Sequence, residues 1–290
     1  TARLTAGGLA HADIPEDLGQ GLAGAYDADG TVLFEAGEVL DFSLSLENGR
    51  VKAALGQKPA ETPDLLALDL TLLDPAVLAA VLGDLSFSSA RLDGVFNLAG
   101  PTRFDGRLGF SDLKSGEITA TEIDGTVQAN FAAVSAGVSR ISLIGKGTGR
   151  GFSAPGAGQP VILEDLTWDL SGYWPDGGTE ITIDRFTVSS SVLDARGNAT
   201  ITTGTGDFKA SGNLLARDIS LFRPEIRAGR YDGGFVLADT GEGFHLGLDG
   251  RVAGVQTEYE GLDPLVAAGG LTLDFMQPRT SAGARIKAGL

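Results

Sequence analysis

The feature that most constrains this chain is a hairpin pattern in which apolar and polar residues alternate around a Gly-Thr-Gly turn. In the segment GNATITTGTGDFKASGN, the apolar Ala199 and Ile201 alternate with polar residues. A period of two places one face of a strand in an apolar environment and the other in water. Gly204 and Gly206 then reverse the chain, because glycine reaches the positive φ angles of hairpin turns. Phe208 resumes the apolar face on the return strand, and similar units of uneven length recur along the sequence.

The composition agrees with many short strands joined by turns. The chain has 43 glycines in 290 residues, about twice the usual ~7% share. Helical patterns of the kind that alternate with strands in a parallel sheet are absent from the sequence. The sequence therefore predicts an all-β fold, an antiparallel meander with one or two short helices. No shift in composition marks a domain boundary, so residues 1–290 are expected to form one continuous repeating segment.

Two segments are expected to interrupt the strands. Asp74 suits a helix N-cap and Pro75 suits the first helical position, and an apolar stripe that ends at Leu82 follows before Gly83. This pattern predicts a short helix. Residues 145–158 are rich in glycine and are expected to be a long connection.

Charge and cysteine content exclude several classes of protein. The 22 lysines and arginines face 38 acidic residues, for a net charge of -16. A nucleic-acid binder needs a cationic surface against phosphates, so no nucleic-acid partner is expected. The absence of cysteine removes disulfides, thiolate metal sites and cysteine nucleophiles. The apolar-rich run Leu65–Leu85 contains three aspartates and a proline, so it does not predict a transmembrane helix.

Candidate catalytic and metal-binding patterns have more ordinary explanations. The glycine-rich segment 145–151 contains a lysine, but Gly-Phe-Ser-Ala-Pro-Gly follows where a phosphate loop needs a helix. His11 and His245 lack neighbours at metal-ligand spacing. The pairs Glu164/Asp165 and Asp69/Asp74 lack the aromatic surroundings of a glycosidase site. We therefore expect no catalytic residue, no metal and no cofactor, and we predict that the protein is not an enzyme.

Three phrases resemble those of the TamB and AsmA-like proteins of Gram-negative bacteria. Residues 215–224 read LARDISLFRP, residues 261–273 read GLDPLVAAGGLTL and residues 100–108 read GPTRFDGRL. The phrases occur in the family as "l-x-A-x-D-l-s-l-f", "l-d-P-l-l-x-G-x-l-x-l" and "G-x-x-x-P-x-f-x-G-x-l", the last with its proline placed later than here. The resemblance spans residues 100–273.

The resemblance implies a long sheet folded lengthwise into an open β-taco, or groove, with an apolar concave face. Such proteins are anchored in the inner membrane, cross the periplasm and take part in moving phospholipid to the outer membrane. TamB also partners the outer-membrane barrel TamA. The sequence shows neither the anchor nor a clear TamA-binding region, so the chain is expected to be a segment of a longer periplasmic protein, and no residue is assigned to TamA.

The apolar strand face is then the candidate site, because acyl chains need a continuous apolar path, worth ~0.8 kcal/mol per methylene. A one-residue register error would turn the whole set to the other face. Two alternatives stay open from the sequence: a closed-core secreted β-helix or adhesin-type structural protein, and a carbohydrate-active β-helix enzyme. The residues predicted to line the groove are Ile181, Ile183, Phe186, Val188, Ala199, Ile201, Phe208, Phe235, Leu237, Leu246, Leu248, Leu271 and Leu273.

Overall fold

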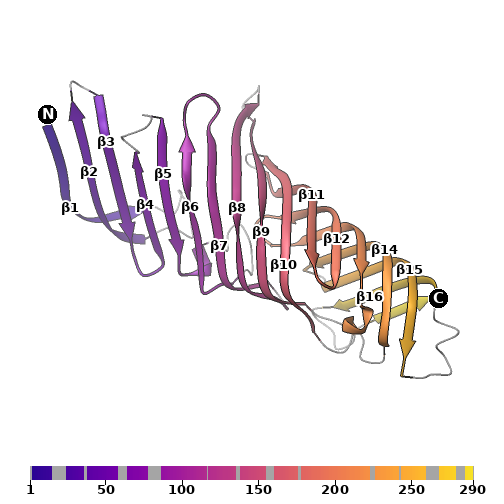
Figure 1. The fold of residues 1–290 in the computed structure, drawn as a ribbon. Coiled ribbons are helices and arrows are strands. Elements are labelled where there is room, and N and C mark those ends of the chain that lie inside the picture. The colour runs from indigo at the N-terminus through magenta and orange to yellow at the C-terminus, as the bar shows by residue number, and fades with distance from the viewer. Residues whose placement is uncertain are drawn as a thin grey trace.

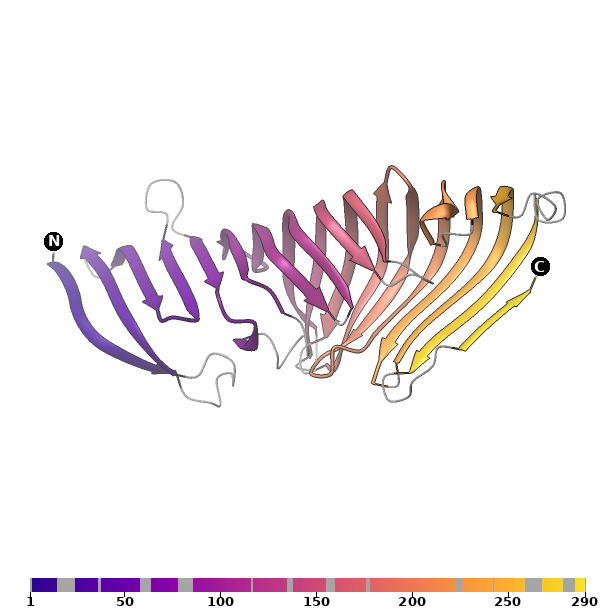
Figure 2. The ribbon, with the colours of Figure 1, turned by 90° about the horizontal axis from the view of Figure 1, so that it is seen from below.

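The chain forms one long, curved β-sheet with its two ends at opposite extremes (Figures 1 and 2). It is seen here in a computed structural model. The strands curl along their length, so that the sheet has the form of a gutter (Figure 2). The structure describes residues 2–14, 24–35, 38–57, 64–77, 86–115, 117–134, 138–154, 160–175, 178–222, 226–241, 243–258, 268–278 and 285–289.

The strands follow one another along the sheet in the order of the sequence. Their bounds are β1 Ala2–Ile14, β2 Gly24–Glu35, β3 Glu38–Glu47, β4 Val51–Gln57, β5 Leu65–Leu72, β6 Ser89–Asn97, β7 Arg103–Ser115, β8 Ile118–Val134, β9 Val138–Ala154, β10 Val161–Pro175, β11 Glu180–Ser190, β12 Leu193–Thr202, β13 Phe208–Ala216, β14 Ile226–Thr240, β15 Gly243–Thr257, β16 Ala268–Pro278 and β17 Arg285–Gly289. Two 3₁₀ turns, η2 Pro75–Val77 and η3 Ile219–Phe222, lie between them.

Each pair of consecutive strands from β1 to β17 is antiparallel, and β1 and β17 are the two edge strands of the described sheet. The 17 strands make a single sheet, and the described strands have substantial contacts only with their neighbours in sequence. The sheet is therefore open and does not close into a barrel or sandwich. The predicted fold, an open antiparallel meander with an apolar concave face, is confirmed, and the coils of a β-helix are not what the chain forms.

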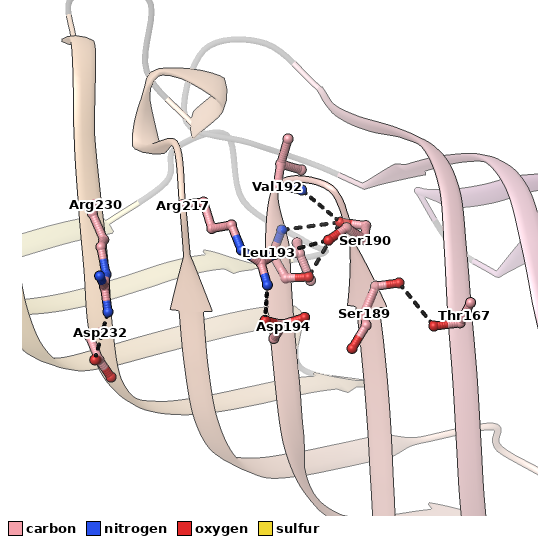
Figure 3. Close-up of polar contacts among 9 residues, drawn as sticks. All are labelled: Thr167, Ser189, Ser190, Val192, Leu193, Asp194, Arg217, Arg230 and Asp232. Carbon is pink, nitrogen blue, oxygen red and sulfur yellow. Dashed lines mark hydrogen bonds and ion pairs between the residues drawn. The ribbon is translucent and has the colours of Figure 1, made fainter.

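Polar side chains and glycines meet the geometry of several turns between the strands. The side-chain oxygen of Asn48 accepts hydrogen bonds from the backbone N–H groups of Arg50 (2.9 Å) and Val51 (2.8 Å). Gly204 and Gly206 have φ angles of 85° and 71°, which the Gly-Thr-Gly turn requires. Between β11 and β12, the Ser190 hydroxyl accepts the backbone N–H of Leu193 at 3.1 Å (Figure 3).

The outer face of the sheet carries its charges, and several of them pair across adjacent strands. Arg91 of β6 contacts Asp69 of β5 at 3.0 Å, and Arg185 of β11 contacts Asp169 of β10 at 3.3 Å. Arg217 pairs with Asp194 near the end of β12 (Figure 3). These pairs are exposed and each adds only ~0–1 kcal/mol. Their main effect is to favour the observed strand register.

Along one long margin of the sheet, short segments fold over the apolar face. We call this the covered margin; Val51 of β4, Leu72 of β5, Ala216 of β13 and Val252 of β15 lie along it. Residues 86–88 bond to β7 there and bring Phe87 against Phe110, with ring centroids 5.9 Å apart. Farther along, η3 contacts both β14 and β10. Ile219 of η3 packs in a cluster with Ala216 and Val252.

The glycine-rich segment that the sequence predicted to be a connection is a strand, so that prediction is wrong. Residues 145–154 belong to β9. Gly145, Gly147 and Gly149 face the apolar side of the sheet, because they pair with Leu170, Trp168 and Leu166 of β10. A Cβ on Gly145 would lie only 3.0 Å from the Trp168 ring. The glycines therefore make room for bulky neighbours and are not signs of a loop.

The predicted helix at Asp74 is present only as its first turn among the described residues. The backbone N–H of Ala76 donates to the Asp74 carboxylate at 2.9 Å, and Arg50 Nε contacts the same carboxylate at 2.6 Å. Asp74 therefore acts as the predicted cap, over η2. The rest of the predicted stripe, Leu78–Leu82, lies outside the described residues.

We expect Gly147→Ala to destabilise the fold by about 1–3 kcal/mol, since a methyl group there overpacks two adjacent strands. Its Cβ would lie 1.9 Å from the backbone oxygen of Asp124 and 2.6 Å from the Cα of Gly125. Gly247→Ala in β15 is the matched control, because its Cβ would have no neighbour closer than 3.7 Å. Urea unfolding of both variants measures the effect, and equal stabilities would contradict the close approach of β8 and β9.

Candidate functional site

The apolar face of the sheet carries three parallel rows of residues that run from β5 to β16 without a polar side chain. Residues paired directly across antiparallel strands share a face, so the strand register defines each row. The first row is Leu70, Leu92, Leu108, Gly125, Gly147, Trp168, Val188, Ala195, Leu214, Gly233, Gly250 and Leu271. The second is Leu68, Gly94, Gly106, Val127, Gly145, Leu170, Phe186, Gly197, Gly212, Phe235, Leu248 and Leu273. The third is Leu66, Phe96, Phe104, Ala129, Leu143, Gly172, Ile183, Ala199, Ala210, Leu237, Leu246 and Phe275.

We call the face formed by these rows the trough. The structure places every residue predicted to line the groove on this one face. Val188 and Leu271 lie in the first row, Phe186, Phe235, Leu248 and Leu273 in the second, and Ile183, Ala199, Leu237 and Leu246 in the third. Ile181, Ile201 and Phe208 pair with one another one step beyond the third row. What these side chains contact in a functioning protein stays a prediction.

A β-bulge keeps the apolar residues of β11 on the trough face. Ile183 and Phe186 are three residues apart, so strict alternation would put them on opposite faces. The register shifts between them, against both β10 and β12, so that both turn inward. β11 is therefore one strand with a bulge at Asp184.

Glycine pairs form the floor of the trough, and aromatic rings lie over them. Gly125 faces Gly147 beside the Trp168 ring, which would be 2.4 Å from a Cβ on Gly125. The Trp168 indole N–H donates to the backbone oxygen of Thr148 at 3.2 Å, which fixes the ring in place. Phe104 lies over a second pair, Gly94 and Gly106, in the same way. Glycines here let adjacent strands approach and let the sheet bend.

Two aromatic rings meet across the floor in the C-terminal half. Phe186 of β11 and Phe235 of β14 belong to the same row and have ring centroids 6.3 Å apart. Gly197 and Gly212 lie between them in that row and offer no side chain. The rings therefore span two strands and narrow the trough at this point.

The dimensions of the trough suit elongated apolar ligands. At a strand spacing of ~4.8 Å, the 12 strands from β5 to β16 give the trough a contour length of about 50 Å. The accessible surface of the chain is 16719 Å², whereas a compact protein of this mass would expose about 11,600 Å². The excess is what an open sheet with one uncovered apolar face is expected to show.

Charge is confined to the outer face and the margins. Among the described residues no charged side chain is buried. The Arg103 guanidinium, followed by the Gln128 amide, donates hydrogen bonds to Asp105 and holds the pKa of that carboxyl below its usual value. The Ala76 N–H and Arg50 lower the pKa of Asp74 in the same direction. These carboxylates stay ionised at neutral pH and stay outside the trough.

Tyr231, at the covered margin, is buried together with its polar hydroxyl group. Only 2% of the residue's surface is exposed. Its hydroxyl donates to the backbone oxygen of Gly234 at 2.6 Å. Burial raises the pKa of the Tyr231 phenol above its usual value. The fold therefore favours the neutral phenol.

This raised pKa predicts a loss of stability at high pH. The stabilisation from neutral Tyr231 is complete below pH ~10, where the unfolded phenol is protonated, and declines as pH rises toward the folded pKa. Tyr231→Phe removes one hydrogen bond, so we expect it to cost about 1 kcal/mol at pH 7 and less above pH ~10. Urea unfolding of both proteins across this pH range measures the difference. Tyr173→Phe is the control, and a constant difference would contradict the assignment.

The other candidate groups of the sequence that the structure describes form surface pairs or are exposed. His245 lies on the outer face, where its ring contacts Asp274 of β16 at 2.7 Å. That pair is isolated: the described residues contain no group of three metal-binding side chains. Asp69 pairs with Arg91, away from Asp74, and Glu164 and Asp165 are exposed. Among the described residues no helix is long and apolar enough to cross a membrane.

One hollow in the described surface is lined mainly by outer-face residues, together with Leu108, Gly125, Gly147 and Trp168 of the trough's first row. It has a volume of about 990 Å³ and lies over the outer face of β6–β11. Its walls include Arg91, Glu122 and Asp169, each already in an ion pair. Charges of both signs line this hollow, so it does not select for ligands of one charge, and the trough stays the stronger candidate.

Sequence reasoning missed half of the trough. The predicted lining begins at Ile181, but the same rows continue through Leu66, Phe104 and Leu143 to β5. Trp168 was seen as part of an alternating strand and was not assigned to the site. One signal in the sequence could have indicated the N-terminal half of the trough and the role of Trp168. Glycine alternates with Lys146 and Thr148, as apolar residues alternate with polar ones in the paired segment of β10.

The fold and the site define an open antiparallel β-gutter with a continuous apolar trough. Comparison adds no relative: the chain matches no protein-family model, no curated protein and no solved structure.

Proposed function

We propose that this chain is a segment of a bridge-like lipid transfer protein that shields phospholipid acyl chains in its trough. In this proposal the parent protein resembles the TamB and AsmA-like proteins, is anchored in the inner membrane and crosses the periplasm. It moves phospholipid toward the outer membrane and supports outer-membrane biogenesis. The outer-membrane barrel TamA is an expected partner of the parent protein, with no contact assigned to these residues. The segment itself is not an enzyme and needs no cofactor.

The observation that carries the proposal is the trough itself, three rows without a polar side chain on a face that no second sheet covers. Each methylene moved from water to such a face gains ~0.8 kcal/mol. The hydrocarbon of one leaflet is ~15 Å deep, so a trough about 50 Å long holds several lipids side by side. Headgroups stay in water, which explains why charge lies only outside the rows.

The proposal is tested by the lipid that the folded protein carries. We expect the segment, purified from bacteria without detergent, to yield more than one phospholipid per chain by quantitative mass spectrometry of an organic extract. Circular dichroism of the same sample should show β-structure. A folded protein that yields no phospholipid, and takes up none from vesicles, would contradict the proposal and favour a structural role.

A further inference from the structure

Aromatic side chains cross the trough at two places, and this bears on where a lipid can lie in it. This inference rests on the proposed function. The first group lies over β6–β8, where the Phe96 ring centroid is 4.8 Å from that of Phe104 and 6.2 Å from that of Phe131. The second group is the pair Phe186 and Phe235, with ring centroids 6.3 Å apart. We call these groups the first bar and the second bar.

The second bar covers the floor of the trough at β12 and β13. Phe186 is on β11 and Phe235 on β14, three strand spacings apart, or about 14 Å. Since their centroids are only 6.3 Å apart, the rings lean toward each other over the glycine pair that lies between them in the second row. Ala199 and Ala210, beside that pair in the third row, are only 4% and 6% exposed. Their burial agrees with a cover over this part of the floor.

The first bar covers the floor at β7 and β8 in the same way. Phe96 and Phe131 meet although β7 separates their strands, so their rings reach across Phe104 and Ala129. These two residues are only 4% and 6% exposed. Among the described side chains of the third row, the buried ones all lie beneath one of the two bars.

Between the bars, the apolar face over β9 and β10 is accessible, and we call this part of the trough the bay. Leu143 of β9 and Leu170 of β10 are partly exposed there. At its two sides, Phe131 leans toward β6 and Phe186 toward β14, so both rings lean away from the bay. Their strands are about 14 Å apart. Carbon atoms in contact lie ~4 Å apart, so two acyl chains side by side between walls need about 12 Å, which the bay provides.

At the second bar the accessible part of the floor narrows to the first row. Ala195 of β12 and Leu214 of β13 belong to that row and are partly exposed. Adjacent rows are two residues apart along a strand, so a strip one row wide measures about 7 Å. Such a strip suits one acyl chain, whereas two chains side by side need more width.

We propose that the two bars divide the trough into separate lipid sites, and that the bay holds both acyl chains of a phospholipid. Phe186 and Phe235 keep the pair of chains off β12 and β13 and leave only the first row as a passage from the bay toward β14–β16. They are positioning residues for the lipid, and transport along the trough proceeds from site to site.

A map of lipid contacts on the wild-type protein is the first test. The protein is loaded from vesicles of phosphatidylcholine that carries a diazirine at the end of one acyl chain. It is then irradiated, and the modified residues are identified by tandem mass spectrometry. We expect adducts at Leu143 and Leu170 in the bay and at Leu214 in the first row of β13. We expect none at residues 210–212 of the same strand, beneath the second bar.

Removal of one ring is the second test. Phe186→Leu and Phe235→Leu each keep an apolar side chain that is too short to reach the ring opposite, so adducts at residues 210–212 should appear in both variants. Val236→Leu is the matched control and should give the wild-type map, because Val236 is next to Phe235 but faces outward and is 48% exposed. Circular dichroism checks folding, and the wild-type comparison within β13 needs no variant.

The outcomes separate failure of this inference from failure of the proposed function. Wild-type adducts at residues 210–212 as frequent as at Leu214, or an unchanged map in folded Phe186→Leu and Phe235→Leu, would overturn the division by bars but keep the trough as a lipid site. Absence of adducts throughout the trough of the folded protein would contradict the proposed function itself.

Discussion

A photoactivatable phenylalanine analogue at Leu237 of β14 will form covalent adducts with phospholipid in cells, whereas the same residue at Val236 will form none. The two positions are adjacent on one strand, and they point to opposite faces. Leu237 lies in the third row of the trough between Ala210 and Leu246. Val236 lies on the outer face and is 48% exposed, so it is at least as reachable from water. Mass spectrometry of the irradiated, purified protein identifies the adduct.

The outer-face position controls for non-specific labelling by membranes. Leu246 on β15 should repeat the result of Leu237, because the two residues are paired directly. Adducts of equal yield at Val236 and Leu237 would mean that lipid does not distinguish the two faces. Such a result would remove the central support of the proposed function.

The second large effect is expected from a single charge in the trough. Ile183→Asp will leave the segment folded but slow lipid transfer at least about 100-fold, since an acyl chain that passes must strip water from the carboxylate at a cost of several kcal/mol. Ile183 is only partly buried, so in the absence of lipid the carboxylate stays in water. Fluorescent lipid transfer between vesicles measures the rate, and far-UV circular dichroism measures folding.

Thr182→Asp is the control for Ile183→Asp, because Thr182 is the neighbour that points to the outer face. It should transfer lipid at the wild-type rate. If Ile183→Asp unfolds the segment, the site behaves as a sealed core, in which an unpaired buried charge is very costly. If it folds and transfers lipid normally, the trough is not the path.

How much of this fold the sequence could predict depends on the local rule each element follows. The hairpin around Gly204 obeys period two and standard turn chemistry, so its strands and apolar face were predicted correctly. At Ile183 and Phe186 the rule fails, because a bulge restores the inward face only through pairing with two neighbouring strands. That pairing depends on the neighbouring strands, and the alternation of apolar and polar residues within one strand does not predict it.

The glycines of β9 show a second limit. Gly145, Gly147 and Gly149 read locally as a flexible connection, and only the bulk of Trp168 and Leu166 opposite explains them. The strands that line the N-terminal half of the trough were predicted as strands, but nothing local indicated that they continue the same rows. The continuity of the trough therefore depends on the register between neighbouring strands, which is set only when the whole sheet forms.

The restriction of contacts to adjacent strands has a consequence for how such a molecule changes size. Because most contacts between the described strands join adjacent strands, the free energy of the sheet is close to a sum of terms for each strand and each adjacent pair, as in solenoid proteins. Removing a whole hairpin such as β12–β13 would shorten the gutter by about 10 Å. The flanking strands β11 and β14 run antiparallel to each other, so they would meet in the orientation that the sheet uses throughout. The length of the sheet can therefore change by one hairpin at a time, in evolution or by protein engineering.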